Sequence, residues 1–227
     1  MANLTSVEFV KRIKQEMQTF HKLRINHPFV KAVSSGTASM EHIRKWALQD
    51  YQFRRIVPRI VMLRYLQCSD LEIQRKLFEI VEEETRGLAT GTAGHNELFF
   101  RFAGSLGLSQ EQLETVEIAP ASAAHAYYVE LVNYILPWFV VISVQVCAEG
   151  SFAPAAAALG QGFIKHYGMK PEAVKFFTVH SEADEDHSSF AEEVAIKYLH
   201  SPALQEQTRQ ATWRRLELLY DTWTVAE

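Results

Sequence analysis

Three side chains in the last third of the chain have the types and the spacing of a metal site. His180, Asp184 and His187 are separated by four and three residues, and at about 100° per helical residue they share one face of a helix. Two imidazoles and a carboxylate are a ligand mix that suits iron or manganese. The alternative interpretation is a solvated polar face, because Glu182 and its neighbours make this stretch generally acidic.

Other acidic and imidazole groups can complete a two-metal site, in which each ion takes several oxygen and nitrogen ligands. Glu149 closes a long uncharged stretch, so its carboxylate should be paired, protonated or metal-bound unless it reaches water at a helix end. Helical steps of three and four residues from Ile80 place Glu83 and Glu84 toward the core. His95 follows a glycine-containing segment and, by itself, fits a surface loop equally well.

The elements that must position these groups are helices. Apolar residues recur at three- and four-residue steps, and caps, prolines and glycines divide the pattern. The predicted helices cover about residues 5–25, 29–33, 39–65, 69–84, a short stretch after residue 109, and then 120–149, 154–168, 171–199 and a last helix that ends near residue 223. Pro58 predicts a kink, and Gly87, Gly91 and Gly94 interrupt the chain before His95. No useful strand-period segment or internal repeat is found, which predicts an all-α protein.

Composition limits the class of protein. The 227 residues, 48% of them hydrophobic, show no linker and predict a single domain over 1–227 with a sizeable core. A net charge of −4 without a basic stripe argues against nucleic acid, and two distant cysteines argue against a disulfide framework. The N-terminus has no signal-peptide core, which predicts a cytoplasmic location. The apolar stretch from Leu131 to Ala148 contains polar residues and no flanking Lys/Arg cluster, so we expect a buried helix and no membrane association.

The run from His180 to His187, with Asp184 between them, resembles the ligand motif of the haem-oxygenase-like di-iron oxidases and oxygenases, near the para-aminobenzoate synthase branch. Glu83, His95 and Glu149 take the remaining ligand positions in the right order, and the resemblance extends over nearly the whole chain. It implies a single-domain haem-oxygenase-like helical bundle of about seven core helices. It also implies two Fe(II) ions, with Fe/Mn as the alternative, and O₂ as co-substrate.

Two departures from the family pattern matter. Twelve residues separate Glu83 from His95 where the compared pattern has seven, so the glycine segment must loop out, and Glu84 is the substitute ligand. The para-aminobenzoate branch consumes its own tyrosine and lysine, whereas the corresponding positions here hold Phe29 and Leu159. The resemblance therefore implies an oxidase or oxygenase that oxidises or cleaves an external small molecule of the amino-acid or fatty-acid class, with a homodimer as the candidate assembly.

Aromatic and cationic side chains on the other helices are candidates for the substrate pocket. We expect Tyr51, Arg55, Tyr128 and Trp138 to line it. Arg54, Arg55 and Arg59 are the guanidinium groups that could face a substrate carboxylate, although core and surface roles are the alternatives.

Two rival functions stay open at this stage. The first is a metal-free thiaminase-type or cofactorless enzyme of the same fold, in which Cys147 would act with Glu217 and Tyr220. The second is a non-catalytic helical module that binds a protein partner or a small ligand.

Overall fold

The computed structural model describes residues 4–224, apart from the side chains of residues 182–188. Every regular element in the described range is helical, which confirms the predicted all-α class. The helices are α1 (Ser6–Gln18), the 3₁₀ turn η1 (Arg24–Asn26), α2 (Pro28–Ser35), α3 (Met40–Arg54), α4 (Val57–Gln67), α5 (Leu71–Arg86), α6 (His95–Ser105), α7 (Gln110–Thr115), α8 (Pro120–Ile135), α9 (Trp138–Ser143), α10 (Gln145–Gly150), α11 (Ala153–Tyr167), α12 (Lys175–Tyr198) and α13 (Pro202–Thr224).

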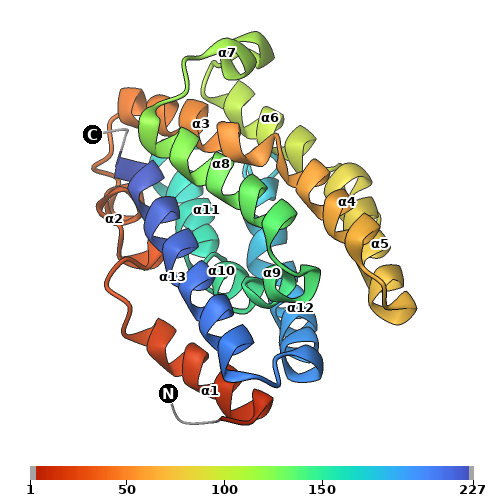
Figure 1. Ribbon diagram of the computed structural model, residues 1–227. Helices are drawn as coiled ribbons and strands as arrows, with labels where there is room; N and C mark the ends of the chain where they lie inside the picture. The colour runs from red at the N-terminus through yellow and green to blue at the C-terminus, as the bar shows by residue number, and fades with distance from the viewer. Residues whose placement is uncertain (1–3, 225–227) are drawn as a thin grey trace.

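The long helix α12 contacts helices on several sides of the bundle. It packs against α1, α6, α9, α10 and α11, while α8 and α13 lie side by side and α4 and α5 form a hairpin along one edge (Figure 1). Helices α2 and α11 approach so closely that a Cβ added at Gly162 would lie 2.8 Å from the Val33 carbonyl oxygen. Segments distant in sequence therefore surround the interior.

Most helix ends follow the local signals, but α6, which begins at His95, was not among the predicted helices. The kink predicted at Pro58 is present, because α3 ends at Arg54 and α4 begins at Val57. The first helix ends at Gln18, earlier than predicted, and a 3₁₀ turn follows it. The single helix predicted over 120–149 is wrong: Leu136 is extended (φ −98°, ψ 153°) before Pro137, and the stretch divides into α8, α9 and α10. A residue before proline avoids the helical region, which explains the first break.

The interior consists of three hydrophobic clusters. The first is rich in aromatic rings, including Trp46, Phe102 and Phe177; the second is mainly aliphatic and holds Leu77 and Val194; and the third is small, around Phe53. The segment Trp138–Tyr167 is long and apolar enough to cross a membrane, but 72% of its most apolar window is buried inside this core. It is a set of core helices, in agreement with the prediction for residues 131–148.

Candidate metal centre

A cavity of about 90 Å³ lies where the three hydrophobic clusters meet. Its apolar wall includes Phe152 and Phe176 from the first cluster, Leu77 and Phe190 from the second, and Phe53 from the third. One ordered water needs roughly 10–15 Å³ of such space, so the cavity has room for a small ligand or several waters. Four titratable side chains from α5, α6, α10 and α12 line the same cavity: Glu84, His95, Glu149 and His180.

The glycine segment between α5 and α6 turns the chain back on itself. Gly87 ends α5 in the left-handed conformation (φ 65°), and Gly91 has a similar φ of 63°. A Cβ added at Gly94 would lie 2.3 Å from the Thr85 carbonyl oxygen, so only glycine allows this close approach. The loop-out required by the twelve-residue spacing is thus present, and it returns His95 to the end of α5.

Glu83 and Glu84 have different roles around the His95 ring. Glu83 is bound by the loop: its Oε2 accepts from the amide of Ala89 (2.7 Å), and its Oε1 accepts from the hydroxyl of Thr90 (2.7 Å) and lies 3.3 Å from His95 Nε2. Glu84 lines the cavity, with Oε2 3.0 Å from His95 Nδ1. That contact is not aligned as a hydrogen bond, and the buried Nδ1 has no hydrogen-bond partner among the described residues.

The proton positions on the two histidines follow from these contacts. Because a carboxylate only accepts, the neutral form of His95 that donates from Nε2 to Glu83 has its lone pair on Nδ1. His180 lies 2.7 Å from the Phe176 carbonyl oxygen through Nδ1, which must therefore carry the proton and leave Nε2 with the lone pair. The two rings are 4.5 Å apart between centroids. In its neutral form, each imidazole thus has one unprotonated nitrogen that could bind a metal.

The two histidine rings differ in their charged neighbours: carboxylates flank His95, whereas a guanidinium lies near His180. Burial disfavours the imidazolium of His95, but the Glu84 and Glu83 carboxylates outweigh burial and raise its pKa above the ordinary value. Burial, the neighbouring His95 and the charge of Arg54 hold the pKa of His180 well below the ordinary value, so its ring is neutral. For Glu83, burial is outweighed by the hydrogen bonds from Thr90 and Ala89, which lower its pKa.

The six predicted ligands divide into those that the structure places and those that it does not. His95, Glu149 and His180 line the cavity, and Glu83 lies directly behind His95. Asp184 and His187 lie outside the described side chains, although the α12 backbone is helical through both positions. Among the side chains that are described, no three His, Cys, Asp or Glu groups meet closely enough to hold a metal ion.

The donor set nonetheless fits iron. It combines two imidazoles, each with a free lone pair, and two carboxylates, and one of the imidazole nitrogens is buried without a hydrogen-bond partner among the described groups. Nitrogen and oxygen donors without thiolate suit iron or manganese. Asp184 and His187, one and two helical turns beyond His180, would supply the remaining donors.

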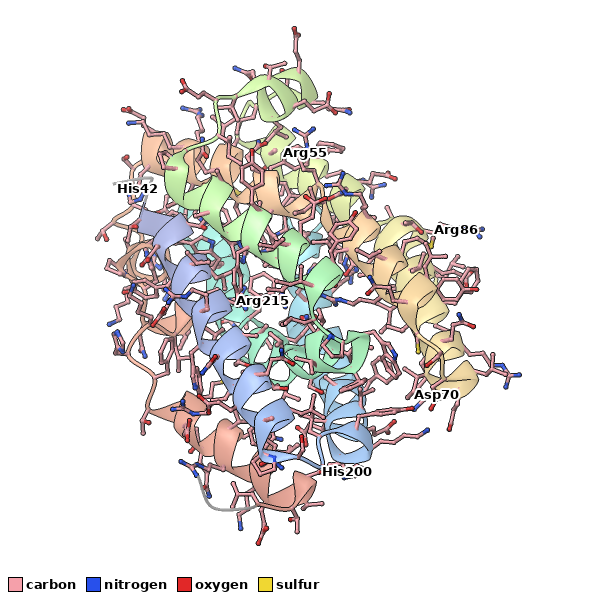
Figure 2. All side chains as sticks on the ribbon, in the orientation of Figure 1. His42, Arg55, Asp70, Arg86, His200 and Arg215 are labelled. Atoms are coloured by element: carbon pink, nitrogen blue, oxygen red, sulfur yellow. The ribbon has the colours of Figure 1, made fainter. Side chains whose placement is uncertain are left out.

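The four predicted pocket residues lie in other parts of the protein. Tyr51 is buried in the aromatic cluster with its ring 5.3 Å from that of Phe100. Arg55 is exposed at the end of α3, well away from the centre of the molecule (Figure 2). Tyr128 packs beside the small third cluster and lines a shallow outer groove, and Trp138 packs edge to face against Tyr198 with ring centroids 4.9 Å apart. Aromatic side chains at helical spacing are thus core residues here.

Sequence reasoning missed most of the cations that line the cavity. Arg24, Arg54, Arg64 and Arg215 all contribute to its wall. Only Arg54 was a candidate, as one of three arginines that could face a substrate carboxylate. A signal for two others is visible in the sequence, because Arg64 follows Ile60 by four residues and Arg215 precedes Leu219 by four. A cation within an apolar helical face indicates a charge that is directed inward.

Two of these arginines already have partners. Arg54 donates from Nε to Asp50 Oδ2 (2.9 Å), and Asp50 Oδ1 accepts from Trp223 Nε1 (2.9 Å). Arg24 donates to the Ala148 carbonyl oxygen at 2.6 Å. Burial and the nearby Arg215 lower the pKa of Arg64 to about 9, and burial lowers that of Arg215 to about 10. Both arginines remain cationic at neutral pH.

The groups of the metal-free alternative are dispersed. Cys147 is fully buried in the second cluster, where burial raises the pKa of its thiol to about 12. Glu217 pairs with Arg214 at 3.4 Å, and the Tyr220 ring packs on His27 with centroids 4.4 Å apart. A thiol with so high a pKa is a poor nucleophile, and the acid/base partners face elsewhere.

Comparison with solved structures identifies the architecture. A TenA homologue from Pseudomonas syringae superposes with a TM-score of 0.83 over 96% of this chain and 92% of that chain, at 14% identity. A domain with a haem-oxygenase-like fold from Shewanella denitrificans gives 0.77 over 95% and 90%, at 18% identity. These similarities show the fold alone, and they confirm the predicted haem-oxygenase-like bundle.

Sequence comparison identifies the family. The chain is 27% identical over 198 residues to a 4-aminobenzoate synthase of Chlamydia muridarum, covering 81% of this chain and 75% of that protein. It is 24% identical over 223 residues to the enzyme of the same name from Nitrosomonas europaea, covering 93% and 88%. A pyrroloquinoline-quinone synthase of Ectopseudomonas mendocina matches over 52% of this chain at 27% identity. Residues 44–220 match the family described as iron-containing redox enzymes, which confirms the resemblance inferred from the ligand motif, and the chain belongs to that family.

Proposed function

We propose that the protein is a cytoplasmic non-haem di-iron enzyme that uses O₂ to oxidise or cleave a small organic substrate. The observation that carries this proposal is the cavity in which Glu84, His95, Glu149 and His180 converge from four helices. The membership of an iron-containing redox family supports the choice of metal. Two Fe(II) ions are proposed, with Fe/Mn as the alternative metal pair.

Each of the two histidines that line the cavity has a neighbour that fixes its orientation. The Phe176 carbonyl holds the proton on His180 Nδ1 and thereby directs Nε2 to the metal. Glu83 accepts from His95 Nε2 and leaves Nδ1 for the metal, beside Glu84. In this arrangement Glu84 is the ligand from α5, and Glu83 is a positioning residue that the loop holds through Thr90.

The surrounding side chains control access to the site. When bound, reduced iron supplies the electrons and open coordination positions that dioxygen requires. The rings of Phe53, Phe152 and Phe176 form an apolar wall that limits water. Phe29 and Leu159, which stand where the para-aminobenzoate branch has its consumed tyrosine and lysine, are fully buried hydrocarbon. This supports oxidation of an external substrate.

Anaerobic titration with Fe(II), followed by exposure to oxygen, tests the metal centre. We expect two equivalents per chain to bind in the wild type and a transient visible absorption to form with oxygen. His180→Ala should lose iron and the absorption, whereas His21→Ala, an exposed histidine near the end of α1, should behave as wild type. Wild-type protein that binds no iron, or a His180→Ala variant that binds and oxidises iron normally, would refute the proposal.

A pair of conservative variants tests the two glutamates. Glu84→Gln should lose one iron equivalent, because a neutral amide replaces a ligand. Glu83→Gln should keep both equivalents but bind iron about 10- to 100-fold more weakly, as expected for a residue that orients a ligand. The opposite pattern, with lost stoichiometry in Glu83→Gln and wild-type titration in Glu84→Gln, would assign the ligand to Glu83.

A further inference from the structure

Two of the four arginines in the cavity wall come from helices on opposite sides of the predicted ligands in the sequence. Arg64 belongs to α4 and Arg215 to α13, and both line the cavity. Arg64 is 8% exposed, and the Nε atom of Arg215 is buried. Figure 2 shows Arg215 near the middle of the molecule. Two buried guanidinium groups thus face the space where a substrate would bind.

Neither group has an ion-pair partner among the described side chains. Arg64 donates from Nε to the neutral amide oxygen of Asn133 (2.9 Å), which is itself held by a hydrogen bond from its Nδ2 to the Val129 carbonyl. Arg215 Nε has no hydrogen-bond partner among the described residues. By contrast, Arg54 is paired with Asp50 at 2.9 Å. Arg64 and Arg215 therefore keep guanidinium donors that a ligand in the cavity could use.

Buried charge of this kind requires a compensating anion. An uncompensated guanidinium in an apolar interior is costly, so natural proteins pair it with an acceptor. The charges of Glu149 and Glu84 act on Arg64, and that of Glu149 acts on Arg215, but under the proposed function both carboxylates bind the metals. The planar fork of a guanidinium matches a carboxylate through two parallel hydrogen bonds. A carboxylate brought by the substrate would meet this requirement.

The remaining lining of this region is hydrocarbon. Val57, Ile60 and Val61 precede Arg64 on the same face of α4, and Leu219 follows Arg215 by one turn of α13. These side chains would contact an apolar body that extends from the charged group. The combination of two donors and an apolar wall is typical of a site for an amphipathic acid.

We propose that Arg64 and Arg215 together bind the carboxylate of the substrate, which is an organic acid with an aliphatic or aromatic body. The proposal deepens the proposed function and rests on it for the assignment of Glu84 and Glu149 to the metals. In the alternative, the two arginines only balance the charge of Glu149 and do not contact the substrate.

The test measures ligand binding by calorimetry to protein that has been incubated anaerobically with Fe(II), with two matched pairs of probes. The pairs are 3-phenylpropanoate with 3-phenylpropanamide, and octanoate with octanamide, so that only the charged group differs within a pair. At least one acid should bind about tenfold or more tightly than its amide. Arg64→Gln and Arg215→Gln should each weaken acid binding about 10- to 100-fold and leave amide binding unchanged.

Matched controls separate the site from general effects of charge and folding. Arg59 of α4, which pairs with Glu130, and Arg214 of α13, which pairs with Glu217, are exposed. Arg59→Gln and Arg214→Gln should bind the acids as wild type. Arg64→Lys and Arg215→Lys keep the positive charge, so they should retain part of the preference for the acid. Circular dichroism identifies any variant that fails to fold. If a glutamine variant fails to fold, acid binding is measured with the lysine variant at the same position.

Three results would overturn the proposal: equal affinity for acid and amide in both pairs, no detectable binding of either acid at millimolar concentration, or wild-type acid binding by both glutamine variants. Iron titration of the same variants distinguishes this failure from failure of the metal centre. If the glutamine variants bind the acids normally but no longer bind iron, the arginines serve only to balance the charge of Glu149. That result would refute their role in substrate binding. Acid binding that depends on the arginines in a protein that takes up no iron would refute the di-iron function alone.

Discussion

His27 should make the protein less stable in mild acid. Its side chain is fully buried and caps helix α2, where Nδ1 accepts a hydrogen bond from the amide of Phe29 at 3.0 Å. That bond requires an unprotonated Nδ1, and the ring packs on Tyr220 with centroids 4.4 Å apart. Burial and the nearby His42 lower the pKa of His27 to about 4 from an ordinary value of 6.5. Folding therefore excludes the proton that the unfolded chain binds.

The sign and size of the effect follow from this difference. Above about pH 6.5 the ring of His27 is neutral in both states, and its full contribution to stability is present. As the pH falls from 6.5 toward 4, the unfolded chain takes up a proton that the folded protein refuses, so stability is lost. With these two pKa values, the loss in free energy of unfolding between pH 7 and pH 5 is about 2 kcal/mol.

Urea denaturation of wild type and His27→Asn at pH 7 and pH 5 measures this effect. Asparagine offers an oxygen in place of Nδ1 to accept from Phe29 and does not titrate. The variant should be less stable at pH 7, because it loses the ring contact with Tyr220, and its further loss at pH 5 should be about 2 kcal/mol smaller than that of the wild type. Equal losses in the two proteins, or a His27 ring that titrates near 6.5 by NMR in the folded state, would refute the reasoning.

Three further predictions concern the close packing of two helices, a buried ion pair and a buried thiol. Gly162→Ala should lower the free energy of unfolding by about 1–3 kcal/mol, because its Cβ would press on the backbone of α2, whereas Gly104→Ala, with open space around it in α6, should raise stability by about 0.5–1 kcal/mol. Asp50→Asn should cost about 3–5 kcal/mol, since it leaves the Arg54 guanidinium buried without its counter-charge; a loss below 1 kcal/mol would contradict this. Cys147→Ala should keep oxygen-dependent activity, and in the folded wild type this thiol should react with a disulfide reagent far more slowly than in urea, because burial raises its pKa to about 12.

Local signals predicted the helices well wherever neighbouring residues decide the backbone. The break near Pro58 and the glycine turn before His95 follow from the φ limits of proline and the left-handed conformations of glycine. Pro137 carried the same kind of signal within the stretch predicted as one helix. There the uniform apolar character of the chain outweighed the proline in the interpretation, although the backbone of Leu136 obeys the proline.

The sequence by itself determined the helical class, the family and the set of groups that can bind a metal, because periodicity and ligand spacing are local properties of the chain. Only the tertiary structure decided which acid faces the cavity. Glu83 and Glu84 are adjacent in sequence, and the folded loop binds the first through Thr90 and directs the second toward His95. Likewise, the cavity gathers Arg64 and Arg215 from helices more than a hundred residues apart in sequence. Such convergence depends on how helices pack, and periodicity within one helix carries no information about its partners.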